Sequence, residues 1–223
     1  MSRPNFEKEL RKLHIEIIEM GSGVETAIAD SVKGFIDNDR ELCKTVIKND
    51  KQIDEMEKRI ESRCLWLIAR EQPVASDLRQ ITTALKIATD MECIGDHASG
   101  IAELARRITK KDAAVDLRRI PSHIPEMATV VVEMVRNAVT AYVNRDLALA
   151  KATEKQDDEV DKYFKLIKKE LVEIFTTQPQ NMDSAIDLLL IAKYLERIAD
   201  HAVSICEWVR FSQTGRRKNT LIF

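Results

Sequence analysis

The strongest constraint on this chain is an internal repeat with a period of about 107 residues. The segment Glu92–Ala98 reads ECIGDHA and Glu196–Ala202 reads ERIADHA, so E-x-x-x-D-H-A occurs twice, 104 positions apart. The similarity extends well beyond this motif, because nine positions between Met20 and Asp54 recur 107 positions later with identical or similar residues. Self-similarity at such a period indicates a duplicated structural unit. The 223 residues are therefore predicted to form two small domains, 1–114 and 115–223, rather than one large one.

The composition favours long helices with solvated outer faces. Charged residues make up 32% of the chain and aromatic residues 5%, and there are only 6 glycines and 5 prolines. The net charge is −2, with 19 basic and 21 acidic residues in 1–114 and 16 of each in 115–223. Because neither half is basic, nucleic acid is not expected as the main partner.

The chain carries no sequence signal for a membrane or for secretion. No stretch approaches the ~18 consecutive apolar residues of a membrane span, and the first residues are too charged for a signal peptide. Cys43 and Cys64 fall on one predicted helix, ~30 Å apart, which is beyond disulfide reach. We therefore expect a cytoplasmic protein with reduced cysteines.

Apolar residues recur at helical spacing in six segments, three in each copy of the repeat. The predicted helices are 6–37, from Asp39 to about Arg70, 74–110, 122–144, from Asp146 to about Thr177, and 181–212. Asp39 is a plausible N-cap and Pro73 ends the second helix. No segment shows a strand pattern, and the basic tail from Gly215 to Lys218 is expected to be solvated and loose. The predicted fold is all-α, two tandem three-helix bundles of up-down-up topology.

Four pairs of acidic residues at i, i+4 spacing recur at equivalent places in the two copies. These residues are Asp50, Asp54, Glu92, Asp96, Asp157, Asp161, Glu196 and Asp200. In each copy the two pairs lie at similar distances on either side of the turn between antiparallel helices, so they should reach the same height within ~3 Å. Residues at i and i+4 share one helix face.

Carboxylates that converge in this way repel one another unless a cation or a raised pKa compensates. Oxygen-only ligation suits Mg²⁺, Mn²⁺ or iron in a hydroxide-bridged cluster, so the eight acids are candidate metal ligands. The alternative is that they form ordinary salt bridges, for which Lys51, Lys58, Arg79 and Lys193 are near enough in sequence.

Recognisable catalytic motifs are missing from the sequence, and we predict that the chain is not an enzyme. Glu-x-x-His, H-E-x-x-H, Walker A and G-x-G-x-x-G do not occur. His97 and His201 each follow an acid by one residue, ~100° around the helix, so they should pack at an interface rather than bind metal. Two other functions remain open, a metal-dependent phosphoesterase that uses the carboxylates and a purely structural helical adaptor.

These features resemble the PhoU family of phosphate-regulon accessory proteins. The likeness rests on the tandem three-helix repeats, on D-x-x-I-D at 50–54 and D-x-x-V-D at 157–161, and on the two E-x-x-x-D-H-A segments. The family phrase is E-R-I-G-D, from which the chain departs at Cys93 and at Ala199. Both departures spare the acids, and they put in doubt only a flanking ion pair and a close helix contact.

The resemblance implies a cytoplasmic, often homodimeric negative regulator of phosphate uptake and of the phosphate regulon. Such proteins link the ATPase subunit of the phosphate ABC transporter, PstB, to the sensor kinase PhoR. The resemblance further implies metal at the paired acidic motifs, either multinuclear iron or magnesium or manganese.

Overall fold

The computed structural model describes residues 3–111, 123–177, 182–217 and 220–221, and helices account for almost all of them. The helices are α1 (Arg3–Ile36), α2 (Arg40–Glu71), α3 (Ala75–Lys111), α4 (His123–Asn144), α5 (Leu147–Thr177) and α6 (Met182–Thr214). These bounds agree with the six predicted segments to within three residues at every predicted end, so the all-α prediction is confirmed. Within the described helices, no stretch is long and apolar enough to cross a membrane.

The first turn of each repeat is built in the same way. The side chain of Asp39 accepts hydrogen bonds from the backbone N–H groups of Glu41 and Leu42, each at 3.0 Å, and so caps α2. Asp146 caps α5 in the same manner, at 2.9 Å from the N–H groups of Ala148 and Leu149. The predicted N-cap is therefore confirmed, and its copy repeats the reversal that sets each pair of helices antiparallel.

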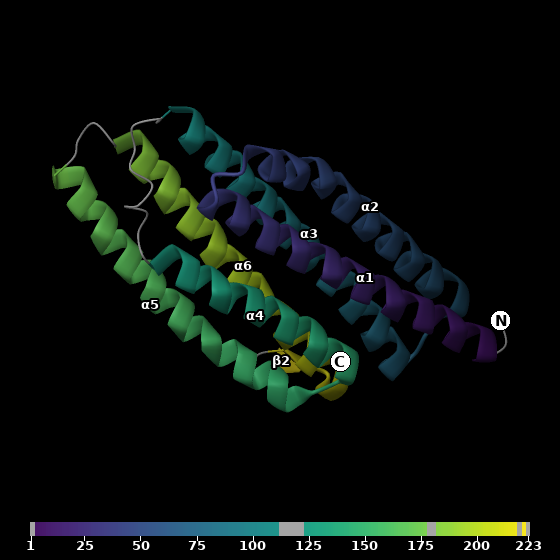
Figure 1. Cartoon of the computed structure of the whole chain (residues 1–223). Helices are drawn as coiled ribbons and strands as arrows, with labels where there is room; N and C mark the ends of the chain where they lie inside the picture. The colour runs from purple at the N-terminus through teal and green to yellow at the C-terminus, as the bar shows by residue number, and fades with distance from the viewer. Residues whose placement is uncertain (1–2, 112–122, 178–181, 218–219, 222–223) are drawn as a thin grey trace.

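The two repeats lie side by side and share an extensive interface. Figure 1 shows α1 and α4 adjacent on the near side, α3 and α6 behind them, and α2 and α5 on the outer flanks, and the contacts α1–α4 and α3–α6 join the repeats. The predicted boundary at 114/115 lies outside the described residues, and independent folding of 1–114 stays a prediction.

The α3–α6 interface combines close backbone approach with buried polar pairs. A Cβ on Gly100 would lie 2.8 Å from the Tyr194 ring, so only glycine lets α6 pack this closely. Arg107 of α3 forms an ion pair with Asp187 of α6, whose side chain is only 5% exposed. Removing Arg107 would leave the buried Asp187 carboxylate uncompensated, which makes this pair a strong determinant of how the repeats dock.

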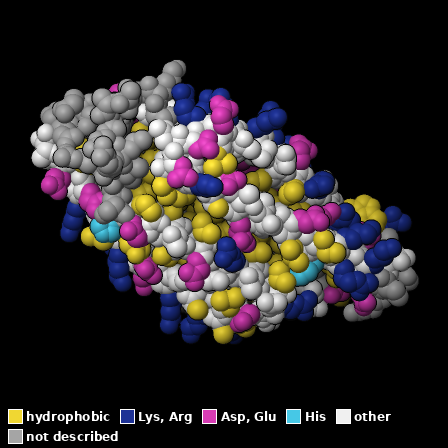
Figure 2. All heavy atoms as spheres, viewed as in Figure 1, with side chains coloured by type: hydrophobic (Ala, Val, Ile, Leu, Met, Phe, Trp, Pro, Cys, Tyr) yellow, Lys and Arg dark blue, Asp and Glu magenta, His cyan; other side chains and the backbone are white. Residues whose placement is uncertain are grey.

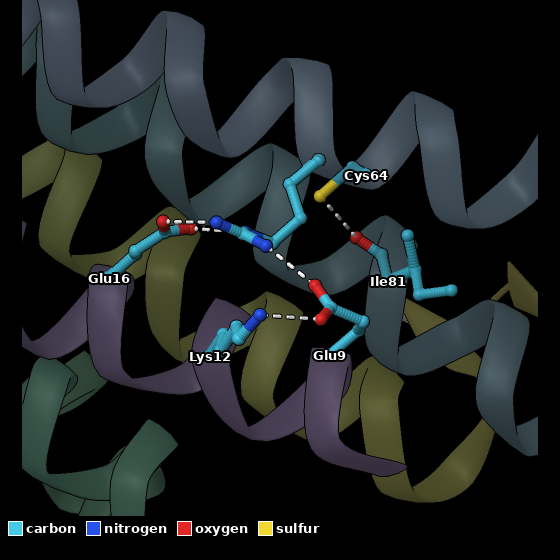
Figure 3. Close-up of polar contacts among 6 residues, drawn as sticks. Glu9, Lys12, Glu16, Cys64 and Ile81 are labelled. Carbon is cyan, nitrogen blue, oxygen red and sulfur yellow. Dashed lines mark hydrogen bonds and ion pairs between the residues drawn. The ribbon is translucent and has the colours of Figure 1, made fainter. Parts of the chain in front are cut away.

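Within the first repeat, Arg63 ties α2 to α1. Its guanidinium donates to both carboxylate oxygens of Glu16 at 2.8 Å and to Glu9 at 2.7 Å (Figure 3). Nearby, the Cys64 thiol donates to the carbonyl of Ile81 on α3, at 3.7 Å. All four cysteines are free thiols, as predicted.

The C-terminal tail differs from its prediction. Arg216–Arg217 (β1) and Thr220–Leu221 (β2) pair as two short antiparallel strands. The predictions of a loose tail and of a chain without strands are therefore wrong for these residues. The cause is a side-chain contact: the Arg217 guanidinium lies 4.1 Å from the centre of the Trp208 ring and 3.2 Å from Glu207. A cation over an aromatic face is attracted by the ring quadrupole, which holds the tail against α6.

Candidate metal centre

Three of the four acids that the spacing predicted to converge in the first repeat do so, and Glu92 is not among them. Asp50 and Asp54 of α2 and Asp96 of α3 place carboxylate oxygens within 4.8 Å of one another, and we call these three the acidic triad. Glu92 lies one helical turn before Asp96 on α3, and the four residues together are the α2–α3 acidic cluster. Asp50 and Asp54 are half-buried and Asp96 is exposed, so a cation could reach the triad from solvent.

The electrostatics of the triad show that its negative charge is not fully compensated. Burial, and then the charges of Asp96 and Asp54, raise the pKa of Asp50 to about 6. Burial and then Asp54 raise the pKa of Asp96 in the same direction. Ser99 lowers the pKa of Asp50 and offsets only part of its rise. The Oδ1 atom of Asp50 is buried without a hydrogen-bond partner, which is costly for an ionised carboxylate.

This donor set fits a hard cation. Three carboxylates from two helices supply only oxygen, the ligand type that Mg²⁺, Mn²⁺ and hydroxide-bridged iron prefer. A cation beside Asp50 would satisfy its unpartnered oxygen and remove the repulsion that raises its pKa. The acidic triad could therefore hold a metal ion.

The equivalent residues of the second repeat, the α5–α6 acidic cluster, are Asp157, Asp161, Glu196 and Asp200. Burial and then the charge of Asp200 raise the pKa of Asp157 to about 6, the same value as for Asp50 in the first repeat. Here, however, cations of the chain itself pair with the other three acids. Lys193 pairs with Glu196, Arg197 lies 3.4 Å from Asp200, and Lys165 lies 3.9 Å from Asp161. Within the described residues, no three groups of this cluster converge as the triad does.

The salt-bridge alternative thus describes the second repeat better than the first. Lys193, one of the four cations proposed from the sequence, pairs with a cluster residue, whereas Lys58 pairs with Glu55 at 3.1 Å, outside the cluster. Within the described part of the chain, no ion pair joins a lysine or arginine to the α2–α3 cluster.

Alignment of the two copies explains this difference. Lys193 and Arg197 correspond to Thr89 and Cys93, so α3 lacks the two cations with which α6 neutralises its acids. Cys93 donates to Glu92 at 3.4 Å, and burial raises the pKa of its thiol to about 12, so this side chain stays neutral where the second copy has a cation. The presence of Cys93 in place of arginine had put a flanking ion pair in doubt. Arg197 forms this pair with Asp200 in the second copy, and Cys93 forms no such pair in the first.

Helix packing differs at the same place. A Cβ on Gly95 would lie 3.0 Å from the Ile53 side chain and 3.3 Å from the Asp50 carboxylate, so glycine allows α3 to approach α2 beside the triad. The second copy has Ala199 at this position, fully buried. An extra methyl group there is consistent with the absence of a convergent group of three acids among the described residues of the second cluster. Both differences, the missing cations on α3 and the change from Gly95 to Ala199, can be seen when the sequences of the two copies are compared position by position.

The two histidines of the repeated motif pack at a helix interface and not against the two acidic clusters, as predicted. His201 hydrogen-bonds Asp90 through Nδ1 at 2.9 Å, and Ser204 donates to the same carboxylate. His97 stacks on Tyr194, with ring centres 5.4 Å apart, and burial lowers its pKa to about 4. Both rings therefore belong to the α3–α6 interface.

Comparison with known proteins gives two matches to the PhoU domain, over residues 17–105 and 124–209. The chain is 37% identical over 218 residues to a phosphate-specific transport system accessory protein PhoU homolog of Clostridium acetobutylicum, covering 97% of this chain and 98% of that protein. A homolog of the same name from Deinococcus radiodurans is 32% identical, covering 97% of this chain and 100% of that protein.

Solved structures show the same fold. PhoU from Pseudomonas aeruginosa superposes with a TM-score of 0.87 at 32% identity, over 95% of this chain and 100% of that one. The phosphate transport system regulatory protein PhoU from Streptococcus pneumoniae has a TM-score of 0.87 at 24% identity, over 96% and 100% of the two chains. Both comparisons extend over both repeats of the molecule.

Proposed function

The chain belongs to the PhoU family, and from that premise we propose that it is a negative regulator of phosphate uptake and of phosphate-responsive genes. The observation that carries this proposal is the extent of the similarity, 37% identity over nearly the full length of both proteins to a phosphate-specific transport accessory protein. The structure supports a scaffold role, because long paired helices present wide surfaces to partners.

We propose two partners at the membrane, the ATPase subunit of the phosphate transporter (PstB) and the sensor kinase PhoR. The printed names of the relatives associate those proteins with the phosphate-specific transport system, which supports the first partner. The second partner, a homodimeric state and a cytoplasmic location rest on the family resemblance alone. In this proposal the chain restrains the transporter when phosphate is plentiful and has no catalytic turnover of its own.

We also propose that the α2–α3 cluster is the main metal site, with Asp50, Asp54 and Asp96 as ligands and Glu92 beside them. The support is the convergence of three carboxylates, the raised pKa of Asp50 and its unpartnered oxygen. A bound cation would supply positive charge that joins α2 to α3. The α5–α6 cluster would be a weaker site, because Lys193 and Arg197, which are replaced by Thr89 and Cys93 in the first repeat, compete for its carboxylates.

Deletion of the gene tests the regulatory proposal. Cells that lack the chain should express phosphate-scavenging genes even when phosphate is abundant. Transporter levels should be held at their wild-type value, so that altered uptake cannot account for the result. Normal repression in the deletion strain would contradict the proposal, and turnover of generic phosphate monoesters by the metal-loaded protein would favour the phosphoesterase instead.

A further inference from the structure

A cavity of about 320 Å³ lies between the two repeats, away from both acidic clusters. Leu10, Leu13 and His14 of α1 form one side of it, and Tyr142 and Val143 of α4 form another. Gln80 and Thr83 of α3 and Ser212 of α6 complete the described lining together with two arginines. Its volume is at the lower end of the range of small-molecule sites, and four helices from both repeats build it.

The lining of this cavity includes an unsatisfied donor. The Thr83 side chain is fully buried, at 0% exposure, and its hydroxyl has no hydrogen-bond partner in the described structure. Threonine in a helix ordinarily returns its hydroxyl to a backbone carbonyl of the preceding turn, as Thr89 does to Leu85 at 3.2 Å. A buried hydroxyl without a partner costs about 1–3 kcal/mol, so a bound acceptor would relieve a real penalty.

The charge around the cavity is positive. Arg11 of α1 and Arg145, in the turn between α4 and α5, both line it, and its described lining contains no carboxylate. The Arg145 guanidinium donates to Gln80 at 2.9 Å, and Gln213 donates to the Arg145 carbonyl at 2.7 Å, so this turn is held over the cavity. Burial and then the Arg145 charge lower the pKa of His14. Figure 2 shows basic side chains gathered at the end of the molecule where α1 begins.

We propose that this cavity is a binding site for a small phosphate-bearing anion. Arginine guanidinium groups match the geometry of phosphate oxygens, and a hydroxyl and an amide can each donate to a further oxygen. The apolar walls formed by Leu10, Leu13 and Val143 leave room for an organic group beside the phosphate. The ligand is therefore either free phosphate or a compact phosphate monoester, and the two are separable by experiment.

Such a ligand would act where the two repeats meet. Its phosphate would contact α1 and α3 of the first repeat together with the turn that follows α4 of the second. Binding there would stabilise the α1–α4 contact and leave the acidic clusters untouched. The site goes beyond the regulatory role proposed above and does not depend on it, since binding is measured on purified protein and regulation in cells.

Calorimetric titration of the full chain with inorganic phosphate, with AMP and with potassium chloride tests the proposal. We expect phosphate or AMP to bind with a Kd below about 1 mM, and chloride not to compete at the same concentration. Tighter binding of AMP would identify a phosphate monoester, and equal or tighter binding of phosphate would identify the free ion. Failure of both to bind would overturn the proposal.

Three variants locate the binding. Thr83→Val keeps the shape of the side chain, removes the unpartnered hydroxyl and should weaken binding about tenfold without loss of thermal stability. Arg11→Gln should weaken it by a similar factor. Arg40→Gln makes the same charge change at an exposed position at the start of α2 and should leave binding unchanged. Binding that is insensitive to Thr83→Val and Arg11→Gln would also overturn the proposal, because the anion would then be held elsewhere.

Discussion

The α2–α3 and α5–α6 acidic clusters occupy equivalent positions in the two repeats but differ in the charge that surrounds them. Asp50 and Asp157 sit in the same place and have the same raised pKa of about 6. In the second cluster Lys193 and Arg197 form ion pairs with the acids, whereas among the described residues the first cluster forms no such pair, and Lys58 interacts with Asp54 only at longer range. Two copies of one structural unit can thus keep the same carboxylates and still differ in whether an external cation is needed.

Neighbouring positions extend the contrast. Glu57 lies near Glu92 and Asp54, and burial and then the charge of Glu61 raise its pKa, with Glu92 and Asp54 adding to the rise. The corresponding residue in the second copy is Phe164, and the Lys193 ammonium lies 5.5 Å from the centre of its ring. One difference has the opposite effect on the charge: the first copy has the positively charged Lys51 where the second has the negatively charged Asp158. The balance still leaves the first cluster with more uncompensated negative charge.

The largest expected effect is a difference in stabilisation by metal. Mn²⁺ at about 100 times its Kd should add about 2.7 kcal/mol to the free energy of unfolding, or about 5–10 °C in Tm for a chain of this size. The variant Glu92→Gln/Asp96→Asn should lose most of this shift, and Glu196→Gln/Asp200→Asn should keep most of it. Thermal melts with Mn²⁺ and with chelator measure both. An equal loss of the Mn²⁺-induced shift in Tm in the two variants would show that the two clusters do not differ in metal binding.

The next effect comes from transferring the cations between the copies. Thr89→Lys with Cys93→Arg gives α3 the two positive charges of α6 and should weaken Mn²⁺ binding at the first cluster about thirtyfold, because two nearby charges at about 1 kcal/mol each cost about 2 kcal/mol. The mirror variant, Lys193→Thr with Arg197→Cys, should strengthen binding at the second cluster. Competitive titration against a metal-sensitive dye reports both affinities. An unchanged affinity in both variants would show that the flanking cations are not the cause.

In metal-free protein, by contrast, the two repeats should respond alike to pH. The pKa values of Asp50 and Asp157 are raised to about 6, above the value of ~3.9 for an unfolded aspartate. The native state therefore holds more protons between pH 4 and 6, and its stability should fall as pH rises through that window.

Asp50→Asn and Asp157→Asn should each remove part of this fall, about 1 kcal/mol after allowance for solvent screening. Urea unfolding at pH 4.5 and pH 7 in the presence of chelator measures it. A stability that rises with pH in wild type and both variants would contradict the raised pKa values.

The smallest effect concerns helix packing. Gly95→Ala gives α3 the residue that α6 has at position 199, and its Cβ would press on Ile53 and Asp50. The gain in helix propensity, about 1 kcal/mol, should be offset by overpacking, typically 1–3 kcal/mol, so we expect little net change or a loss of up to about 2 kcal/mol, with weaker Mn²⁺ binding. Urea unfolding and a Mn²⁺ titration give the two values. Increased stability with unchanged Mn²⁺ affinity would show that the close approach is not needed.

The sequence predicted the helices and the triad because both depend on local periodicity. The 3–4 spacing of apolar residues and the Asp39 cap determine the helix bounds, and equal distances from the turn bring Asp50, Asp54 and Asp96 together. The side-by-side docking of the repeats was not predicted. It depends on contacts such as Gly100 with Tyr194, between residues almost 100 positions apart, which carry no periodic signal.

The difference in flanking cations between the two clusters could have been predicted from the sequence but was not. It required comparing the residues that flank the acids, such as Thr89 with Lys193, rather than the acids themselves. The tail hairpin was missed for a different reason. The stacking of Arg217 on Trp208 is a tertiary contact of a two-residue strand, too short to give an alternating pattern.

A direct count of bound ions tests the central claim, that the first repeat carries the main metal site. Free Mn²⁺ is quantified by electron paramagnetic resonance during titration of the wild type, of Asp50→Asn/Asp54→Asn and of the matched variant Asp157→Asn/Asp161→Asn. The first variant should lose the tightest binding and the second should retain it. Loss of the tightest binding from the Asp157→Asn/Asp161→Asn variant alone, or no ion retained by the wild type, would contradict it.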